Sequence, residues 1–421
     1  MPERVLEEYK MKLAAKGGEP VRTRPWPAWP VGGEDEKHAL NRVVESGLWG
    51  IGSPEIEALE KEFAEFCGVS RAVCTANGTV SLMISLKAIG VGAGDEVIVP
   101  AYTFLATAMA VVLVNAVPVF ADIDPDTYCI DPSSVEQAIT SRTKAVIPVH
   151  LGGHPADMDR LCALADRHGI RIIEDAAQAH GAEWKGRRVG SLGHLGSFSF
   201  QSSKNVSGGE GGAVVTNDEE LYQAAWSYHN CGRVLGGRWY DHYFAAANYR
   251  LSGWQAAVIR VQLRRLQELN AKRMESAAYL DRKLAEIPGI RPLVRRTEAT
   301  AHAYHLYIIR YDSEHFAGAS REAFVKALNA EGIPASTGYT PLYKLPAFGN
   351  PDVLRCPLGC PLYAGERPRY AEMDLPMTER ACSSEGVWLF HNLLLAEKRD
   401  LDDIVDAVAK VHENASELAG L

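Results

Sequence analysis

A chain of 421 residues is long enough for two domains with a large buried core, and 47% hydrophobic with 23% charged residues is ordinary for a globular protein. The net charge of -9 and the lack of a dense Lys/Arg run argue against nucleic-acid binding. The most apolar stretch, 106–121, contains Asn115 and Pro118, which argues against a membrane span. The N-terminus has no apolar signal-peptide core, so we expect a cytoplasmic protein.

Eight cysteines are spread along the chain without the spacing of a disulfide framework. Cys356 and Cys360 are four residues apart in a Pro/Gly-rich loop, but two further zinc ligands are not evident nearby. We therefore expect reduced thiols and no metal site.

Residues 1–33 are predicted to form an N-terminal arm. Segment 24–30 reads Arg-Pro-Trp-Pro-Ala-Trp-Pro, and its three prolines exclude a regular helix. Trp26 and Trp29 are expected to anchor this arm against the body of the protein or against a partner subunit.

Alternating strand and helix signals follow the arm. The predicted strands lie at 72–76, 96–100, 117–121, 144–150, 170–173, 197–201 and 212–216, with helices such as 80–89 and 157–168 between them. This alternation indicates βα units and a mostly parallel sheet.

The composition changes after about Gly253. A long charged helix ends before Pro288, a strand pattern covers 302–311, and two helices are expected at 320–331 and 401–411. The sequence therefore predicts a large domain over residues 34–253 and a smaller α/β domain over residues 254–421.

Two of the predicted strands end in groups that carry chemistry. Asp175 follows the apolar run 170–173, and Lys204 follows the run 197–201 in a loop rich in Ser and Gly. Ligands of open α/β sheets bind at the carboxyl ends of strands. Pyridoxal phosphate needs a lysine amine for its aldehyde and an acid that keeps its pyridine nitrogen protonated. Lys204 and Asp175 meet both needs, although such a pair also arises by chance, with the lysine in solvent.

Further residues fit the same cofactor, each with a structural alternative. Backbone amides at Gly78 and Thr79, at the start of a helix, would hold a phosphate; otherwise they form a plain turn and cap. Phe104 would stack on a flat ring or pack in the core. Asp175 would bind the ligand or cap the turn that follows it.

The residues around these positions extend the candidate site. Gln178 shares a face with Asp175 if a helical turn begins there, whereas His180 is expected to be structural. Ser199 alternates with two phenylalanines, so its hydroxyl can face the site while their rings pack away from it.

These motifs together resemble the DegT/DnrJ/StrS-type sugar aminotransferases, which depend on pyridoxal phosphate and have fold type I of the aspartate aminotransferase superfamily. The similarity runs from about residue 17 to the C-terminus, and the motifs that carry it are 77–79, 96–104, 174–181, 197–212 and 248–252. The resemblance implies a large domain with a mostly parallel, seven-stranded sheet flanked by helices, plus a smaller C-terminal α/β domain.

The resemblance also implies a role for each matching residue. Lys204 matches the lysine that binds the cofactor and moves the proton, and Asp175 matches the partner of the pyridine nitrogen. Phe104 matches the aromatic ring stacked on the cofactor, and Gln178 the residue near its 3-hydroxyl. The phosphate contacts match Gly78, Thr79 and Ser199, together with Asn248 and, less closely, Arg250 from a neighbouring subunit. A homodimer with shared active sites follows from that last match.

The segment 17–30 resembles the subset that acts on scyllo-inosose-type cyclitols or makes 3-amino-5-hydroxybenzoate, with L-glutamine as a common amino donor. We therefore expect amino transfer from L-glutamine or L-glutamate to a keto-sugar or keto-cyclitol. Two alternatives are an aminohydroxybenzoate synthase-like dehydratase and a non-catalytic regulatory partner that binds pyridoxal phosphate. The loops 234–247 and 339–370, which would contact the ketone, do not match the subset clearly, so the acceptor stays open.

Overall fold

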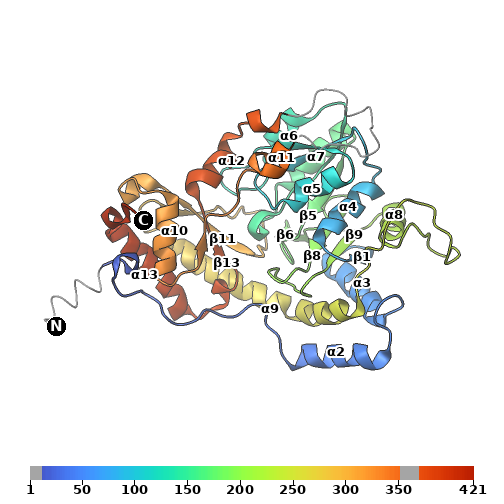
Figure 1. Ribbon diagram of the computed structural model, residues 1–421, viewed down its shortest axis with the longest axis horizontal. Coiled ribbons are helices and arrows are strands. Elements are labelled where there is room, and N and C mark those ends of the chain that lie inside the picture. Colours follow the sequence, from blue (N-terminus) through green and yellow to red (C-terminus); the bar gives the residue numbers. More distant parts are fainter. Residues whose placement is uncertain (1–11, 351–368) are drawn as a thin grey trace.

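The computed structural model describes residues 12–350 and 369–421, and it is an α/β protein (Figure 1). Its main sheet has the strand order β1 (Arg71–Thr75), β9 (Gly212–Thr216), β8 (Leu195–Ser199), β5 (Arg171–Asp175), β4 (Thr143–Val146), β2 (Glu96–Pro100) and β3 (Val117–Ala121). β9 runs antiparallel to both of its neighbours, and the other pairs are parallel. The predicted seven-stranded, mostly parallel sheet is confirmed.

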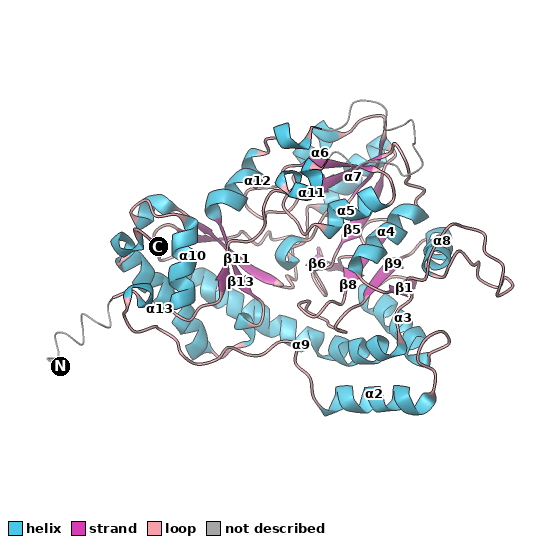
Figure 2. Cartoon of the chain, viewed as in Figure 1, coloured by secondary structure: helices cyan, strands magenta, loops and turns pink. Residues whose placement is uncertain are grey.

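Side chains of the central strands alternate between two cores, because successive residues of a strand point to opposite faces. In β2, Val97 and Val99 pack in one core with helices α4 (Gly78–Ala88) and α5 (Ala106–Leu113). Ile98 packs in the other core with α6 (Pro132–Ala138) and α7 (Met158–His168). Helices thus flank both faces of the sheet (Figure 2), which explains why its strands read as continuous apolar runs.

Helices α3 (Pro54–Cys67) and α9 (Gly253–Leu284) contribute to a further core with β8 and β9. α9 begins with a capping box in which Ser252 accepts from the backbone amide of Gln255 and the Gln255 side chain accepts from Ser252. Helix α8 (Glu219–His229) lies against α4 and β1.

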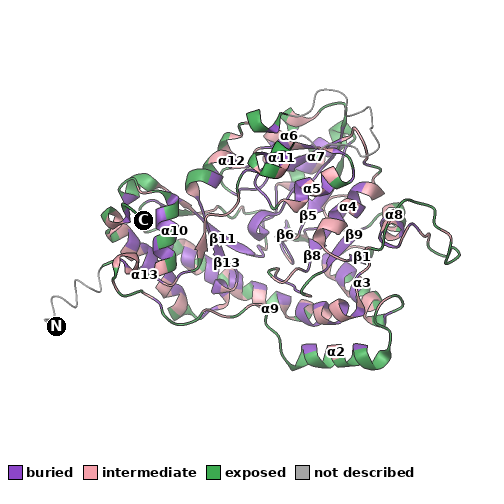
Figure 3. Ribbon diagram, viewed as in Figure 1, coloured by how far each residue is buried: buried purple, intermediate pink, exposed green. Residues whose placement is uncertain are grey.

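The C-terminal part of the chain has its own four-stranded sheet. Its antiparallel strands are, in order, β10 (Ile290–Pro292), β11 (Leu306–Tyr311), β13 (Gly386–Phe390) and β12 (Ala335–Ser336). Helices α10 (Arg321–Ala330) and α13 (Lys398–Glu413) pack with this sheet and the C-terminal end of α9 in one hydrophobic core. Figure 3 shows buried residues concentrated along these shared faces.

Several elements differ from the sequence-based expectation, among them the following three. The strand expected at 144–150 ends at Val146, because Pro148 has no backbone N–H for the ladder. The strand expected at 302–311 begins at Leu306, after Tyr304 adopts a positive φ of 45°. Helix α2 (Glu34–Ser46) was not predicted; its sequence is mostly charged and polar.

The N-terminal arm packs on the chain's own C-terminal part. Arg22 is buried and donates to Asp400 (2.8 Å) and Asp403 (2.6 Å), both in the first two turns of α13 (Lys398–Glu413). The buried Glu331 carboxylate accepts from the backbone amides of Ala14 and Val21. The arm then continues past α9 to α2 (Figure 1), so the predicted anchoring is made within one chain.

No helix among residues 12–350 and 369–421 is both long and apolar enough to cross a lipid bilayer.

Candidate active site

The strand directions bring the predicted site residues to one edge of the main sheet. β1, β8, β5 and β2 are mutually parallel, so their carboxyl ends meet there. A cavity of about 1050 Å³ opens at this edge, and Gly78, Thr79, Phe104, Asp175, Gln178, Ser199 and Lys204 all line it. Seven residues from four separate segments are therefore brought together as the sequence predicted.

Lys204 lies in the loop after β8 and is half-buried in the cavity wall. Its backbone N–H donates to the carbonyl of Gln201 at 2.8 Å, in a turn. Burial lowers the pKa of the Lys204 amine, and the charge of Asp175 opposes this shift only in part. A lower pKa leaves more of the amine unprotonated, which is the form that attacks an aldehyde.

Asp175 ends β5 and is 6% exposed. One carboxylate oxygen accepts from the Thr107 hydroxyl at 2.9 Å, and the other accepts from the backbone amide of Ala177 at 3.2 Å. Burial raises the pKa of the Asp175 carboxyl, while the hydrogen bond from Thr107 and the charge of Lys204 oppose that rise. The carboxylate therefore caps the turn after β5 and also presents a buried negative group to the cavity.

The proposed phosphate end of the site is formed where α4 begins against β8. Asn77, rather than Thr79, caps α4, since its side chain accepts from the amide of Val80 at 3.0 Å. This leaves the first turn of α4, with Gly78 and Thr79, at the cavity wall. A Cβ atom on Gly78 would lie 2.7 Å from the Cβ of Ser199, so these residues are in close contact.

We expect Gly78→Ala to weaken cofactor binding by about tenfold to a hundredfold, because the added methyl pushes α4 away from Ser199 and moves the amides that face the phosphate. Absorbance titration with pyridoxal phosphate measures the dissociation constant. Gly92→Ala is the matched control, since a Cβ at that position meets no atom within 4 Å. Equal affinities of the two variants would contradict the assigned role of Gly78.

Phe104 and Gln178 occupy different parts of the cavity wall. Phe104 follows β2 and is 59% exposed, although it lies at a cavity rather than on a convex surface. Gln178 is buried, accepts from the amide of Gly152 at 2.7 Å and donates to the Tyr339 hydroxyl at 3.0 Å. Phe104 thus offers an open aromatic face, and Gln178 is held rigidly beside Asp175.

Asn248 and Arg250 do not reach this cavity within the chain. Asn248 is exposed, and its side-chain oxygen accepts from the backbone amide of Arg250 at 3.2 Å. Arg250 donates to the side chain of Asn230 at 2.8 Å. Within one chain, Asn248 is therefore not part of the cavity wall.

Four residues of the site were not singled out as ligand contacts from the sequence. Thr107 bonds Asp175, and Tyr339 bonds Gln178. Trp29 and His391 line the cavity and donate to the backbone carbonyls of Lys204 and Ser203. The sequence hints at a role only for Thr107, because its hydroxyl interrupts the apolar helix 106–113. Trp29, Tyr339 and His391 lie far from Lys204 in the sequence, so no local pattern connects them with it.

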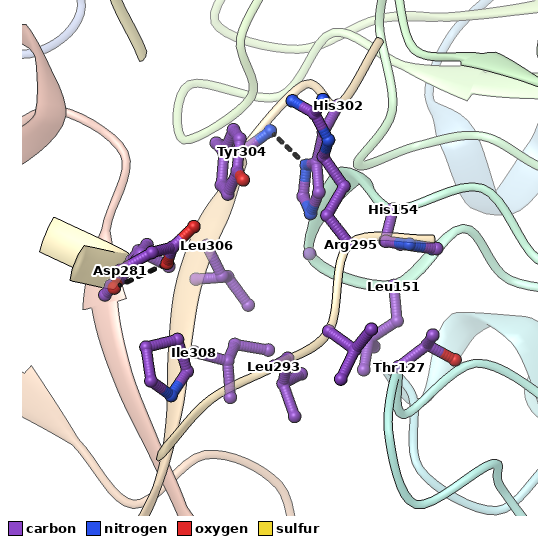
Figure 4. A pocket seen from close by; sticks show the side chains of 14 residues that line it. Thr127, Leu151, His154, Asp281, Leu293, Arg295, His302, Tyr304, Leu306 and Ile308 are labelled. Atoms are coloured by element: carbon purple, nitrogen blue, oxygen red, sulfur yellow. Dashed lines mark hydrogen bonds between the residues drawn. The ribbon is translucent and has the colours of Figure 1, made fainter. Parts of the chain in front are cut away.

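Another cavity, of about 20 Å³, lies between β11 and the segment that follows β10 (Figure 4). It has room for about one water molecule. His302 lines it, and its ring accepts from the backbone amide of Tyr304 at 2.8 Å. This volume cannot hold a cofactor, so the site is assigned to the larger cavity.

No group of three or more His, Cys, Asp or Glu that could hold a metal ion occurs in the described part of the chain. Cys356 and Cys360, the pair considered from the sequence, lie outside the described residues. The six described cysteines are free thiols.

The residues present fit pyridoxal phosphate. Asp175 is a buried carboxylate whose hydrogen bonds come from a hydroxyl and an amide, which leaves its charge available for a pyridinium nitrogen. Gly78 keeps the start of α4 in contact with Ser199, as a phosphate cradle requires. Lys204 supplies the amine, and Phe104 supplies a face for the ring.

Known proteins resemble this chain over almost its full length. A protein of Streptomyces kanamyceticus, provisionally named L-glutamine:3-amino-2,3-dideoxy-scyllo-inosose aminotransferase, is 43% identical over 97% of this chain and 98% of its own. The L-glutamine:2-deoxy-scyllo-inosose aminotransferase of Streptoalloteichus tenebrarius is also 43% identical, over 96% of this chain and 99% of its own.

Solved structures agree with this similarity. The crystal structure of 3-amino-5-hydroxybenzoic acid synthase matches with a TM-score of 0.84 at 36% identity, covering 93% of this chain and 100% of the synthase. The pyridoxal phosphate form of a protein of Streptococcus pneumoniae, provisionally named a sugar aminotransferase, matches with a TM-score of 0.80 at 28% identity, covering 94% and 100%.

The family model described as DegT/DnrJ/EryC1/StrS aminotransferase family matches residues 30–409. Pyridoxal phosphate is the cofactor of this family, and the cavity has the groups that it needs. The chain therefore belongs to the DegT/DnrJ/EryC1/StrS aminotransferase family and is a pyridoxal phosphate-dependent aminotransferase.

Proposed function

We propose that this aminotransferase moves the amino group of L-glutamine, with L-glutamate as the alternative donor, to the ketone of a cyclitol of the scyllo-inosose class. The observation that carries the proposal is the 40–43% identity, over 96–97% of this chain, to relatives named for that reaction. The acceptor of those relatives is either 2-deoxy-scyllo-inosose or its 3-amino-2,3-dideoxy form, and both are candidates here.

Pyridoxal phosphate, when bound, supplies an electron sink for the carbon that loses or gains the amine. Asp175 would favour the protonated form of the pyridine nitrogen, because an opposite charge nearby stabilises that form. Thr107 keeps that carboxylate oriented through its 2.9 Å hydrogen bond. Lys204 would supply the amine that binds the cofactor and would carry a proton to and from the reacting carbon.

The remaining proposed residues orient the cofactor. Gly78, Thr79 and Ser199 would bind its phosphate, Phe104 would cover one face of its ring, and Gln178 would lie near its 3-hydroxyl. The cavity also contains polar side chains beyond this set, among them Gln201, Glu210 and Asn392. Side chains of this kind can exchange hydrogen bonds with the hydroxyls of a cyclitol.

We further propose a homodimer with shared active sites, in the cytoplasm. Aromatic side chains of the segment 234–247, including Trp239, Tyr240 and Phe244, are exposed. Such a patch is typical of a subunit interface, and it directly precedes Asn248, the residue that would contribute to the partner's site. The free thiols favour a reducing compartment.

A dehydratase that forms 3-amino-5-hydroxybenzoate is the second candidate, because the solved synthase matches with a TM-score of 0.84. Its 36% identity is below the 43% of the cyclitol relatives, which favours amino transfer. The third reading, a non-catalytic partner, is disfavoured by the presence of Lys204 and Asp175 in one cavity.

We expect 15N from the α-amino group of L-glutamine to appear in the amine formed from a cyclitol ketone. The kcat/KM for this ketone should be at least about a hundredfold above that for a nucleotide-linked keto-sugar, because a substrate that lacks the matching hydrogen bonds loses about that much. Mass spectrometry of the product measures the transfer. L-Glutamine labelled at the side-chain amide is the control and should leave the product unlabelled. Turnover confined to the nucleotide-linked ketone, or conversion of an aminodehydroshikimate-like compound to an aromatic product, would reject the proposal.

A further inference from the structure

The loop that carries Lys204 is held by two side chains from opposite ends of the sequence. The indole N–H of Trp29, in the N-terminal arm, donates to the carbonyl of Lys204 at 3.2 Å. The Nε2 atom of His391, which follows β13, bonds the carbonyl of Ser203 at 3.0 Å. The two rings also meet edge to face, with centroids 4.6 Å apart. Two consecutive carbonyls of the loop are therefore fixed by one aromatic cluster.

A buried arginine determines which nitrogen of His391 carries the proton. Arg273 of α9 is 0% exposed, and its Nη2 donates to Nδ1 of His391 at 3.1 Å. A guanidinium has only donors, so Nδ1 must accept, and the proton of a neutral ring lies on Nε2. Nε2 can then donate to the carbonyl of Ser203.

Burial, with a contribution from the same arginine, keeps the histidine ring uncharged. Burial, reinforced by the charge of Arg273, lowers the pKa of His391 to about 3. Arg273 itself bonds the side-chain oxygen of Asn270 at 3.0 Å and lies 5.1 Å from the centre of the Trp29 ring. No carboxylate within the described residues forms an ion pair with it, and burial lowers its pKa to about 9. A buried cation without a carboxylate partner costs stability, and such perturbed groups cluster at functional sites.

The arm segment that leads to Trp29 is itself fixed by two side-chain hydrogen bonds. The Asn392 side chain, next to His391, donates to the carbonyl of Pro27 at 2.8 Å. Earlier in the arm, the indole of Trp26 donates to the carbonyl of Gly332 at 2.9 Å. Trp29 is therefore held in place over the Lys204 loop by contacts that do not involve that loop.

We propose that Trp29 and His391 are positioning residues for Lys204, with Arg273 selecting the tautomer of His391 that can hold the loop. The carbonyls of Ser203 and Lys204 flank the Cα atom of Lys204, so hydrogen bonds to both fix its position and the direction of its Cα–Cβ bond. The direction from which the Lys204 amine approaches the cofactor follows from these. The position of the Lys204 amine affects the rate, because a displacement of a reacting group by about 1 Å can strongly slow a proton transfer. The inference rests on the assignment of Lys204 as the cofactor-binding lysine.

The test measures the visible absorbance of cofactor-loaded protein without substrates, and then its turnover with them. Trp29→Phe and His391→Ala should each shift the pH midpoint of the visible absorbance by at least about half a unit, because the nitrogen that joins Lys204 to the cofactor moves to a new environment. Each should also lower kcat by about three- to tenfold, as expected for one lost hydrogen bond. His391→Gln, which keeps an amide donor at the position of Nε2, should return the midpoint toward that of the wild type.

Trp49→Phe is the matched control, since it removes an indole donor that bonds the backbone carbonyl of Val44, outside the arm and outside the cavity wall. It should leave the midpoint unchanged. An unchanged midpoint in both Trp29→Phe and His391→Ala, or an equal shift in Trp49→Phe, would overturn the proposal. Failure of the underlying assignment is distinguishable, because Lys204→Ala would then keep the absorbance of the wild type.

Discussion

Replacement of Lys204 by alanine lowers kcat for amino transfer by at least about 10⁴-fold and removes the lysine-dependent visible absorbance. The variant loses both the amine that condenses with the cofactor and the group that moves the proton, and proton transfer alone accounts for about 10² to 10⁴ in rate. Because Lys204 lies at the cavity beside Asp175, its loss leaves that buried carboxylate without the neighbouring cation. Absorbance spectra and single-turnover kinetics with L-glutamine measure the two effects.

Two further variants separate the role of the amine from that of its charge. Lys204→Arg keeps a cation near Asp175 but has no primary amine, so it should be as inactive as the alanine variant. Lys61→Ala removes an exposed lysine of α3 and should retain full activity. Activity of Lys204→Arg above about a tenth of the wild-type value would contradict a nucleophilic role.

Mixing subunits tests the shared site together with the lysine. A dimer of one Lys204→Ala subunit and one Asn248→Ala subunit contains one site with an intact lysine that receives Asn248 from its partner. Random reassociation makes half of the dimers mixed, each with one of two sites intact, so the mixture should regain about a quarter of wild-type activity. No gain on mixing would reject the proposed contribution of Asn248.

Asp175→Asn should lower kcat by about 10²- to 10³-fold while the cofactor still binds, since a preorganised charge at the reacting ring is worth about that much. Asparagine fills the same space and can still accept the hydrogen bond from Thr107. The lost negative charge removes the preference for a protonated pyridine nitrogen. Steady-state kinetics of the loaded variant give kcat, and its absorbance gives the bound cofactor.

Thr107→Val provides a graded comparison, because it leaves the Asp175 carboxylate and removes one of its hydrogen bonds. This change should raise the pKa of Asp175 further and lower kcat by about three- to tenfold. A turnover of Asp175→Asn close to that of the wild type would show that another group partners the pyridine nitrogen.

Much of the fold followed from local pattern. β2 reads Glu-Val-Ile-Val-Pro and is buried throughout, so its apolar run marked a central strand without reference to the rest of the chain. Since β1, β2, β5 and β8 are parallel to one another, the residues after them had to meet at one edge of the sheet. The sequence therefore predicted that Gly78, Phe104, Asp175 and Lys204 lie close together.

The rest of the site depends on contacts between distant segments. Trp29 and His391 lie 175 and 188 residues from the loop carbonyls that they bond, and Tyr339 lies 161 residues from Gln178. Nothing in the sequence around these residues shows whether they line a ligand-binding cavity or pack in the hydrophobic core. The need for glycine at position 78 likewise appears only when β8 is placed beside α4.

Peptide mapping tests the central claim most directly. Borohydride reduction of the purified, cofactor-loaded protein attaches pyridoxal phosphate permanently to the amine with which it has condensed. Mass spectrometry of the digest should find the label on the peptide that contains Lys204, and prior addition of L-glutamine should remove it. A label on any other lysine, or a label at Lys204 that L-glutamine leaves unchanged, would contradict the account.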